Sequence, residues 1–216
     1  MNVLARIVGT VLLGLLCAMP AQAQEPTRKD ALSALASPDA EARRRAIIQL
    51  AKVGEMADSD ALVRALRDED AIVRNYAEQA LWIIWSRSGD PEIDRQFADG
   101  LAQMQAGSMQ AGAAIFSRII EARPEFAEGW NKRATIYFLM GDHERSLADC
   151  HEVVKRNPVH FGALAGYGQI YAQRGEPERA LDYFRRALAV NPNMEGVRLN
   201  AAVIEQGLAD KGRKGI

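Results

Sequence analysis

The sequence predicts an all-α protein, an α-solenoid of stacked helical hairpins. Two observations carry this prediction. Turn residues recur every 34 positions in the second half of the chain, namely Gly107, Gly141 and Gly175 together with Pro124, Pro158 and Pro192. A repeat of this length, with Gly and Pro at the same place in each unit, is typical of stacked helix pairs. The composition also favours helices, since Ala, Leu, Arg and Glu are abundant and only 8 of 216 residues are Pro.

Charge and apolar content limit the classes of function. The chain carries 27 basic and 28 acidic residues. A protein that binds nucleic acid needs a basic excess on one face, so we expect no nucleic-acid partner. With 48% hydrophobic residues, the chain has enough apolar surface to form a folded core.

Residues 1–23 have the order of a secretory signal peptide. Arg6 gives a positive start, Ile7–Met19 is an apolar run, and Ala21-Gln22-Ala23 is a small-x-small cleavage site. We therefore expect cleavage after Ala23 and a periplasmic or secreted protein.

Two other roles for this segment are weaker. The apolar run falls short of the about 17–25 residues that a membrane anchor needs, so no integral membrane segment is expected after cleavage. A lipoprotein would be attached through Cys17, but the preceding Leu16 is not a small residue. Cleavage leaves Cys150 as the only cysteine, and we expect it to be a buried and inert thiol.

Residues 24–30 form a polar leader, and residues 31–86 hold a shorter repeat. Its paired positions lie 31 residues apart: Leu35 and Leu66, Asp39 and Asp70, Arg43 and Arg74. Each unit reads as a short helix, a turn with Asp, and a longer helix. Asp39 and Asp70 are placed to cap the second helices. Arg43 and Arg74 lie one turn later, within reach of those carboxylates.

This pair of units resembles the HEAT repeat in its short bacterial form, most clearly at Asp70-Ala71-Ile72-Val73-Arg74. The first unit departs from the pattern at Ala42. Two units are fewer than a solenoid usually needs, so we expect them to dock on the following residues. The apolar run Leu81–Trp85 is the predicted seam, a ligand pocket on its tryptophans being the alternative, and residues 87–92 form a linker.

Residues 93–194 resemble three tetratricopeptide repeats, Ile93–Phe126, Ala127–His160 and Phe161–Met194. Small residues stand where the paired helices would cross, at Gly100, Ala134 and Gly168. A large Phe lies opposite in the outer repeats, at Phe116 and Phe184, with Cys150 in the middle one. Residues 195–210 are predicted to be a cap helix, and residues 211–216 a basic tail.

The motifs of catalytic and metal sites are absent from the sequence. It has no G-x-S-x-G, P-loop or H-E-x-x-H pattern. Cys150, His143, His151 and His160 lack the spacing of zinc ligands. We therefore expect a protein that is not an enzyme and needs no cofactor.

The resemblance to tetratricopeptide repeats implies that the first helix of each repeat lines a concave groove for a protein or peptide client. The residues expected to contact the client are Phe97, Leu101, Met104, Asn131, Thr135, Phe138 and Gln169. A carboxylate clamp of this family needs Lys and Asn in the first repeat and Lys and Arg in the third, and this chain has Phe97, Leu101, Gly162 and Gly166 at those positions. This lining favours an apolar segment or helix.

Two alternatives stay open in this groove. Phe97, Leu101 and Phe138 would instead be core residues if they pack only against neighbouring helices. Gly162 and Gly166 serve either close packing between hairpins or room for a bulky side chain of the partner.

Opposite charges occupy equivalent positions of the first two repeats, at Asp99 and Arg133. We expect a salt bridge across the repeat boundary, with the Tyr167 hydroxyl as a further partner of Arg133. Otherwise both side chains extend to solvent, where such a pair contributes little.

The sequence thus predicts an exported, non-enzymatic scaffold or adaptor that binds a protein or peptide. Glu128–Ala134 and Pro158–Leu164 resemble segments of exported bacterial tetratricopeptide proteins, which suggests a role in cell-envelope assembly or maintenance. The alternative is a rigid accessory subunit of a larger envelope enzyme or secretion complex.

Overall fold

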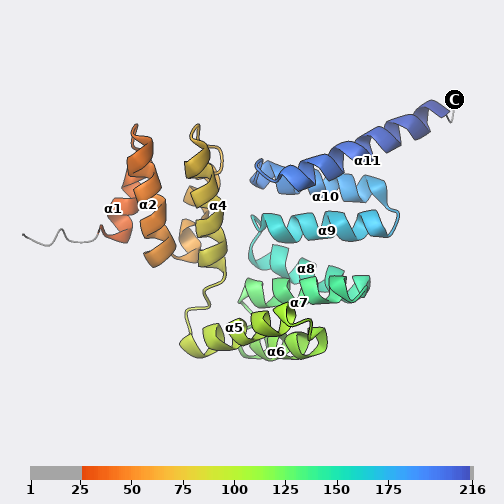
Figure 1. The fold of residues 1–216 in the computed structure, drawn as a ribbon, viewed down its shortest axis with the longest axis horizontal. Helices are drawn as coiled ribbons and strands as arrows, with labels where there is room; N and C mark the ends of the chain where they lie inside the picture. Colours follow the sequence, from red (N-terminus) through yellow and green to blue (C-terminus); the bar gives the residue numbers. More distant parts are fainter. Residues whose placement is uncertain (1–25, 215–216) are drawn as a thin grey trace, which may run out of the picture.

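The computed structural model describes residues 26–214 (Figure 1). The predicted signal peptide, the first two residues of the polar leader and residues 215–216 of the tail lie outside this range. Over the described range the chain forms α-helices and one short 3₁₀ turn, with no β-strand. The predicted all-α class is confirmed. None of the helices within residues 26–214 combines the length and the apolar composition needed to cross a membrane.

An N-terminal block of four helices precedes the hairpins. It comprises α1 (Arg28–Ala34), α2 (Ala40–Val53), the 3₁₀ turn η1 (Met56–Asp58), α3 (Ser59–Ala65) and α4 (Ala71–Trp85). The first helix begins inside the predicted leader, because Thr27 and Asp30 cap it reciprocally: each side chain accepts a hydrogen bond from the other's backbone N–H. The interpretation of this block as HEAT-like stays a prediction.

Three hairpins and a final helix follow. The hairpins are α5 (Pro91–Gln105) with α6 (Met109–Ala122), α7 (Ala127–Leu139) with α8 (His143–Arg156), and α9 (Phe161–Gln173) with α10 (Pro177–Val190). The last helix, α11 (Glu195–Lys214), continues through most of the predicted basic tail. In Figure 1 its C-terminal half extends beyond α10.

The recurring glycines and prolines mark the ends of these helices as expected. Gly107, Gly141 and Gly175 follow α5, α7 and α9 with φ of 74°, 77° and 72°. A side chain is strained in this left-handed region, whereas glycine adopts it freely. The second helices α6, α8 and α10 each end two residues before the recurring proline, which cannot continue a helix.

Close crossing of paired helices depends on the predicted small residues. A Cβ added at Gly100 would lie 2.7 Å from Cζ of Phe116, and one added at Gly168 would collide with the ring of Phe184. In the middle hairpin Ala134 and Cys150 are buried in one cluster. The small-to-large pairing inferred from the sequence is confirmed.

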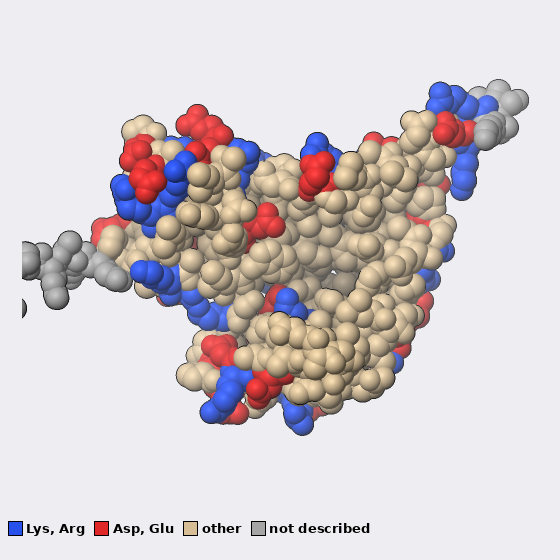
Figure 2. All heavy atoms as spheres, in the orientation of Figure 1, with Lys and Arg blue, Asp and Glu red and all other residues tan. Residues whose placement is uncertain are grey.

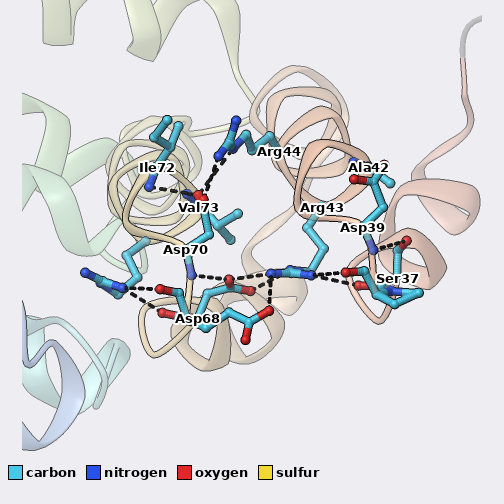
Figure 3. A network of polar contacts seen from close by, with 12 residues as sticks. Ser37, Asp39, Ala42, Arg43, Arg44, Asp68, Asp70, Ile72 and Val73 are labelled. Carbon is cyan, nitrogen blue, oxygen red and sulfur yellow. Dashed lines mark hydrogen bonds and ion pairs between the residues drawn. The ribbon is translucent and has the colours of Figure 1, made fainter.

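The capping roles of Asp39 and Asp70 are confirmed, but the arginine partners differ from the prediction. Arg43 forms a two-point ion pair with Asp68 of the second unit, at 2.7 Å for both bonds, and not with Asp39 (Figure 3). Its third nitrogen donates to the carbonyl oxygens of Ser37 and Pro38. A helical side chain points toward the N-terminus and arginine is long, so Arg43 reaches past the cap to the preceding turn.

Arg74 repeats this arrangement one unit later. It donates to the carbonyl oxygens of Asp68 and Glu69, at 2.8 and 3.0 Å, rather than to Asp70. The Asp70 carboxylate accepts from two backbone N–H groups of α4 and pairs with Arg44 of the first unit at 2.6 Å. The predicted pairing within each unit is therefore wrong, and the bonds from Arg43 and Arg44 join the two units instead.

The N-terminal block docks on the third hairpin through α4, as Figure 1 shows. Trp85 is buried, stacks on His160 with ring centroids 4.7 Å apart, and contacts Phe161 at 5.1 Å. Trp82 meets Phe161 edge-on at 5.2 Å. The expected docking and the seam at Leu81–Trp85 are confirmed.

Hydrogen bonds reinforce this junction at the end of α10. Arg67 donates to the carbonyl oxygens of Ala189 and Val190, and Asn193 donates to the carbonyl oxygen of Leu66 at 2.7 Å. These bonds link residues more than a hundred positions apart in the chain, so the block folds back onto the hairpins.

Candidate functional site

A cavity of about 360 Å³ lies between α7, α8, α9 and the start of α11. Four of the predicted client-contacting residues line it, namely Asn131, Thr135, Phe138 and Gln169. The rest of its lining is Ala134, Ser146, Cys150, Gly162, Ala163, Ala165, Gly166, Ile170, Met194 and Val197. No lining residue carries a charge.

A second hollow of about 330 Å³ adjoins the first between α9, α10 and α11. Its lining is also uncharged: Gln169, Ala172, Gln173, Phe184, Asn200, Val203 and Ile204. The two hollows share Gln169, and we call them together the groove. In Figure 2 the surface over the stacked hairpins is hollowed and largely tan, with charged residues mostly at its margins.

Gly162 and Gly166 play different parts in this groove. A Cβ added at Gly162 would lie 2.5 Å from Cη2 of Trp82, so Gly162 serves close packing with the N-terminal block. A Cβ at Gly166 would have only the sulfur of Cys150 nearby, at 3.7 Å, which is ordinary contact. Gly166 therefore opens a recess in the groove, and Cys150 lies at its base.

The three predicted residues of the first hairpin lie outside the groove. Phe97 is 5% exposed and packs edge-on against Phe116 and Phe126, with ring centroids 5.6 and 5.5 Å apart. Leu101 and Met104 pack partly buried against the same cluster. Their contact with a client stays a prediction.

A buried polar cluster stands where the groove meets the N-terminal block. Its centre is the fully buried carboxylate of Glu128, with His160 Nε2 at 2.9 Å, Lys132 Nζ at 2.7 Å and Asn131 Nδ2 at 3.0 Å. The backbone N–H of Ala163 donates to Nδ1 of His160, so the ring proton is assigned to Nε2 and is donated to Glu128. His160 is thereby the N-cap of α9.

Electrostatics keep Glu128 ionised. Burial alone would raise the pKa of this carboxyl, but the hydrogen bond from His160 and the charge of Lys132 outweigh burial and lower the pKa from 4.5 to about 2. Lys132 also lies over the Trp82 ring, 5.5 Å from its centroid. Lys132 and the amide of Asn131 therefore both bind Glu128 inside the fold.

Two local features of the sequence point to this cluster, although neither belongs to a catalytic or metal-site motif. His160 directly precedes the first residue of α9, which is the position of a helix cap. Glu128 stands early in α7, where a carboxylate is favoured by the helix dipole. Their contact depends on hairpin stacking and could not be read from spacing.

The predicted salt bridge between Asp99 and Arg133 is wrong. Asp99 is exposed, and Arg133 forms a two-point pair with Asp149 at 2.8 Å for both bonds. The ring of Tyr167 stacks on Tyr183, with centroids 4.3 Å apart, instead of bonding to Arg133. A carboxylate on the paired helix of the same hairpin is nearer to Arg133 than one in the neighbouring repeat.

The thiol at the base of the recess is unreactive in character. Burial, with the nearby Asp149 charge, raises the pKa of Cys150 to about 12. Within residues 26–214 no three His, Cys, Asp or Glu side chains gather as metal ligands would.

Comparison with known proteins agrees with the repeat pattern. The family model "Tetratricopeptide repeat" matches residues 134–195. A TPR repeat-containing protein of Rhizobium etli is 30% identical over 128 residues, which are 58% of this chain and 62% of that protein. The chain thus spans less than two thirds of that relative's length.

Two solved structures share the fold. The first tetratricopeptide domain of Spaghetti, bound to the HSP90 peptide SRMEEVD, has a TM-score of 0.52 and 20% identity, over 54% of this chain and 93% of that one. The Sgt2 domain of Aspergillus fumigatus has a TM-score of 0.54 and 16% identity, over 57% and 83%. These identities establish the fold alone. With the family match, they support tetratricopeptide repeats in the C-terminal half of an all-helical solenoid.

Proposed function

We propose that this protein is a non-enzymatic scaffold or adaptor that binds a segment of a client protein in the groove. The observation that carries the proposal is an uncharged hollow that runs along α9 from the Gly166 recess to α11. Clefts with apolar walls and a few polar groups are the usual binding sites of proteins. The Spaghetti domain, which shares the fold, binds a peptide.

Polar side chains along the groove are available to a client. Among the described residues, Gln169, Gln173 and Asn200 are exposed and their amides make no hydrogen bond within the protein. An amide offers a donor and an acceptor together, which matches the N–H and C=O groups of a peptide backbone. The groove thus combines apolar walls with groups that can hold a main chain.

The experiment is to fill the recess. Gly166→Leu should abolish client capture without lowering the melting temperature, because a Cβ at Gly166 meets only ordinary contact, with Cys150, and leucine favours a helix over glycine. Gly207→Leu is the matched control, since Gly207 lies in α11, outside the groove and free of close neighbours. Affinity capture from the cell envelope should return the same client with wild type and the control, but not with Gly166→Leu. Capture that all three share equally would place binding elsewhere.

We also propose that the protein is exported and acts in cell-envelope assembly or maintenance. This rests on the order of charge, apolar run and cleavage site in residues 1–23. The intact mass of protein from the periplasmic fraction should correspond to a chain that begins at Gln24. A retained leader, or a lipid on Cys17, would contradict export by this route.

The second candidate is a rigid accessory subunit of a larger envelope complex. The docking of α4 on the third hairpin favours it, because a fixed angle between the blocks is the property that a spacer needs. In the capture experiment this role gives a complex of constant stoichiometry that Gly166→Leu leaves intact.

A further inference from the structure

We infer that the groove selects an extended, uncharged segment that places an apolar side chain in the Gly166 recess. This inference rests on the proposed function and specifies the chemistry of the client.

The groove first constrains the charge of the segment that it can bind. No residue that lines the two hollows is Asp, Glu, Lys or Arg. Lys132, which follows the lining residue Asn131 in α7, pairs with Glu128 at 2.7 Å, and its side chain is 22% exposed. An acidic segment would lose water from its carboxylates here and gain no opposite charge, which is costly. A basic segment would fare no better, because Glu128 is fully buried.

The shape of the recess gives the second step. Its lining includes the small residues Ala134, Ala165 and Gly166 and the apolar side chains of Phe138, Met194 and Val197. The Cys150 thiol at its base is neutral at physiological pH. The volume of about 360 Å³ lies near the lower end of the ~300–1,000 Å³ of ligand pockets, which suits side chains of a segment rather than a whole helix.

The unpaired amides give the third step. Gln169 and Gln173 are one turn apart on α9, and Asn200 lies across the second hollow on α11. A bound helix satisfies its own backbone groups and would leave these amides without use. An extended segment presents free N–H and C=O groups at this spacing, so the amides favour an extended client.

The acidic peptide SRMEEVD, the ligand of the Spaghetti domain, is a suitable negative probe. It carries three carboxylate side chains, and the groove offers it no free cation. We expect it to bind at least about tenfold more weakly than an uncharged peptide selected on this protein.

A phage-displayed library of random dodecapeptides tests the inference. Selection uses the purified protein, and counter-selection uses Gly166→Leu, with Gly207→Leu as the matched control. Peptides that depend on Gly166 should share an uncharged core with Val, Leu or Ile. The dissociation constant of the best peptide should change less than about twofold between 50 and 500 mM salt, since screening affects charge pairs only. Gln169→Ala with Gln173→Ala should weaken it about tenfold, and both side chains are exposed, so folding is unaffected.

The outcomes separate the inference from the proposed function. Gly166-dependent peptides with an acidic or basic core, a strong salt effect, or competition by SRMEEVD would overturn the inference and leave groove binding standing. The absence of any Gly166-dependent peptide would overturn both. If Gly166→Leu fails to fold, loss of binding in the double glutamine variant decides the same question.

Discussion

The contact between α7 and the start of α9 depends on the carboxylate of Glu128. It is fully buried, and it accepts hydrogen bonds from His160, Lys132 and Asn131. Removal of one member of such a cluster leaves the others buried and unpaired, which costs more than the loss of the bond itself. The polar cluster therefore fixes the start of α9 against α7.

The first prediction concerns the pH dependence of stability. Because the pKa of Glu128 is about 2 in the folded protein and 4.5 when unperturbed, its contribution is complete above pH about 4.5 and is lost as the pH falls toward 2. The contribution is of order 3 kcal/mol, given 1.36 kcal/mol per pKa unit. Glu128→Gln should thus be less stable than wild type at pH 7, and the difference should shrink at pH 3. Urea unfolding of both proteins at each pH measures it. A difference independent of pH would mean that Glu128 is not held ionised.

The second prediction concerns Arg133 and its true partner. The side chains of Arg133 and Asp149 are only 17% and 5% exposed. Asp149→Ala should therefore cost about 2–3 kcal/mol, whereas Asp99→Ala at the exposed position should cost less than about 0.5 kcal/mol. Double-mutant cycles with Arg133→Leu should give clear coupling to Asp149 and none to Asp99. Coupling to Asp99 would restore the inter-repeat bridge.

The ion-pair errors show what a single sequence can and cannot give. The sequence located the helix caps at Asp39 and Asp70, since a cap depends on local order along the chain. It did not locate the partners of Arg43 and Arg133. A long side chain reaches several carboxylates, and the choice among them depends on where other helices lie.

At the scale of single helices, α9 also combines features that the sequence predicts with features that only the structure reveals. Its small residues Gly162, Gly166 and Gly168 were visible in the sequence, but their separate roles were not. Gly168 makes room for Phe184 and Gly162 makes room for Trp82, whereas a Cβ at Gly166 would meet only ordinary contact. Gly162 differs from Gly166 only because α4 docks here and brings Trp82, a residue of the N-terminal block, against Gly162.

The third prediction compares two glycines of α9. Gly162→Ala should destabilise the protein by about 1–3 kcal/mol, because the added methyl collides with a Trp82 ring already held by Phe161 and Lys132. Gly166→Ala should be neutral or slightly stabilising, since its methyl meets only ordinary contact. Chemical denaturation of the two variants provides the comparison. Equal effects would mean that Trp82 is not wedged against α9.

The predicted client-contacting residues differ in whether they also stabilise the fold. Asn131 was predicted to contact the client, yet it donates to Glu128 and is 8% exposed. Asn131→Ala is therefore expected to weaken the polar cluster that joins α7 to α9 as well as the groove. Thr135 and Gln169 are exposed in the groove, so their substitution reports on binding more directly.

At the scale of the whole molecule, the docking of α4 makes the solenoid fold back on itself. The sequence predicted that the N-terminal block docks, because its two units are too few to be stable alone. It did not predict that the block would skip the adjoining first hairpin and pack on the third. This choice depends on complementary surfaces, namely Trp82 and Trp85 against His160 and Phe161.

The last prediction follows from this long-range contact. The two blocks share one core cluster that contains Trp85 and Phe161, so wild type should unfold in a single transition. Trp85→Ala removes a 2% exposed ring and its hydrogen bond to Ser59, a loss of about 3–5 kcal/mol. Part of that loss falls on the contact between the blocks, and part, including the bond to Ser59, falls within the N-terminal block itself. We therefore expect the variant to unfold in two steps, the N-terminal block first. Circular dichroism follows both steps. The tryptophan fluorescence of the variant comes from Trp82 in α4 and Trp130 in α7, so it reports on both blocks.

Ile83→Ala is the matched control for this experiment. Ile83 lies on the same helix, two residues before Trp85, but its side chain is 46% exposed. Its loss should cost less than about 1 kcal/mol and leave a single transition. In Trp85→Ala, limited proteolysis should also cut within residues 86–90, where the released block would expose the join between α4 and α5. A Trp85→Ala protein that still unfolds in one step and resists cleavage there would show that the hydrogen bonds from Arg67 and Asn193 hold the blocks together without the aromatic seam.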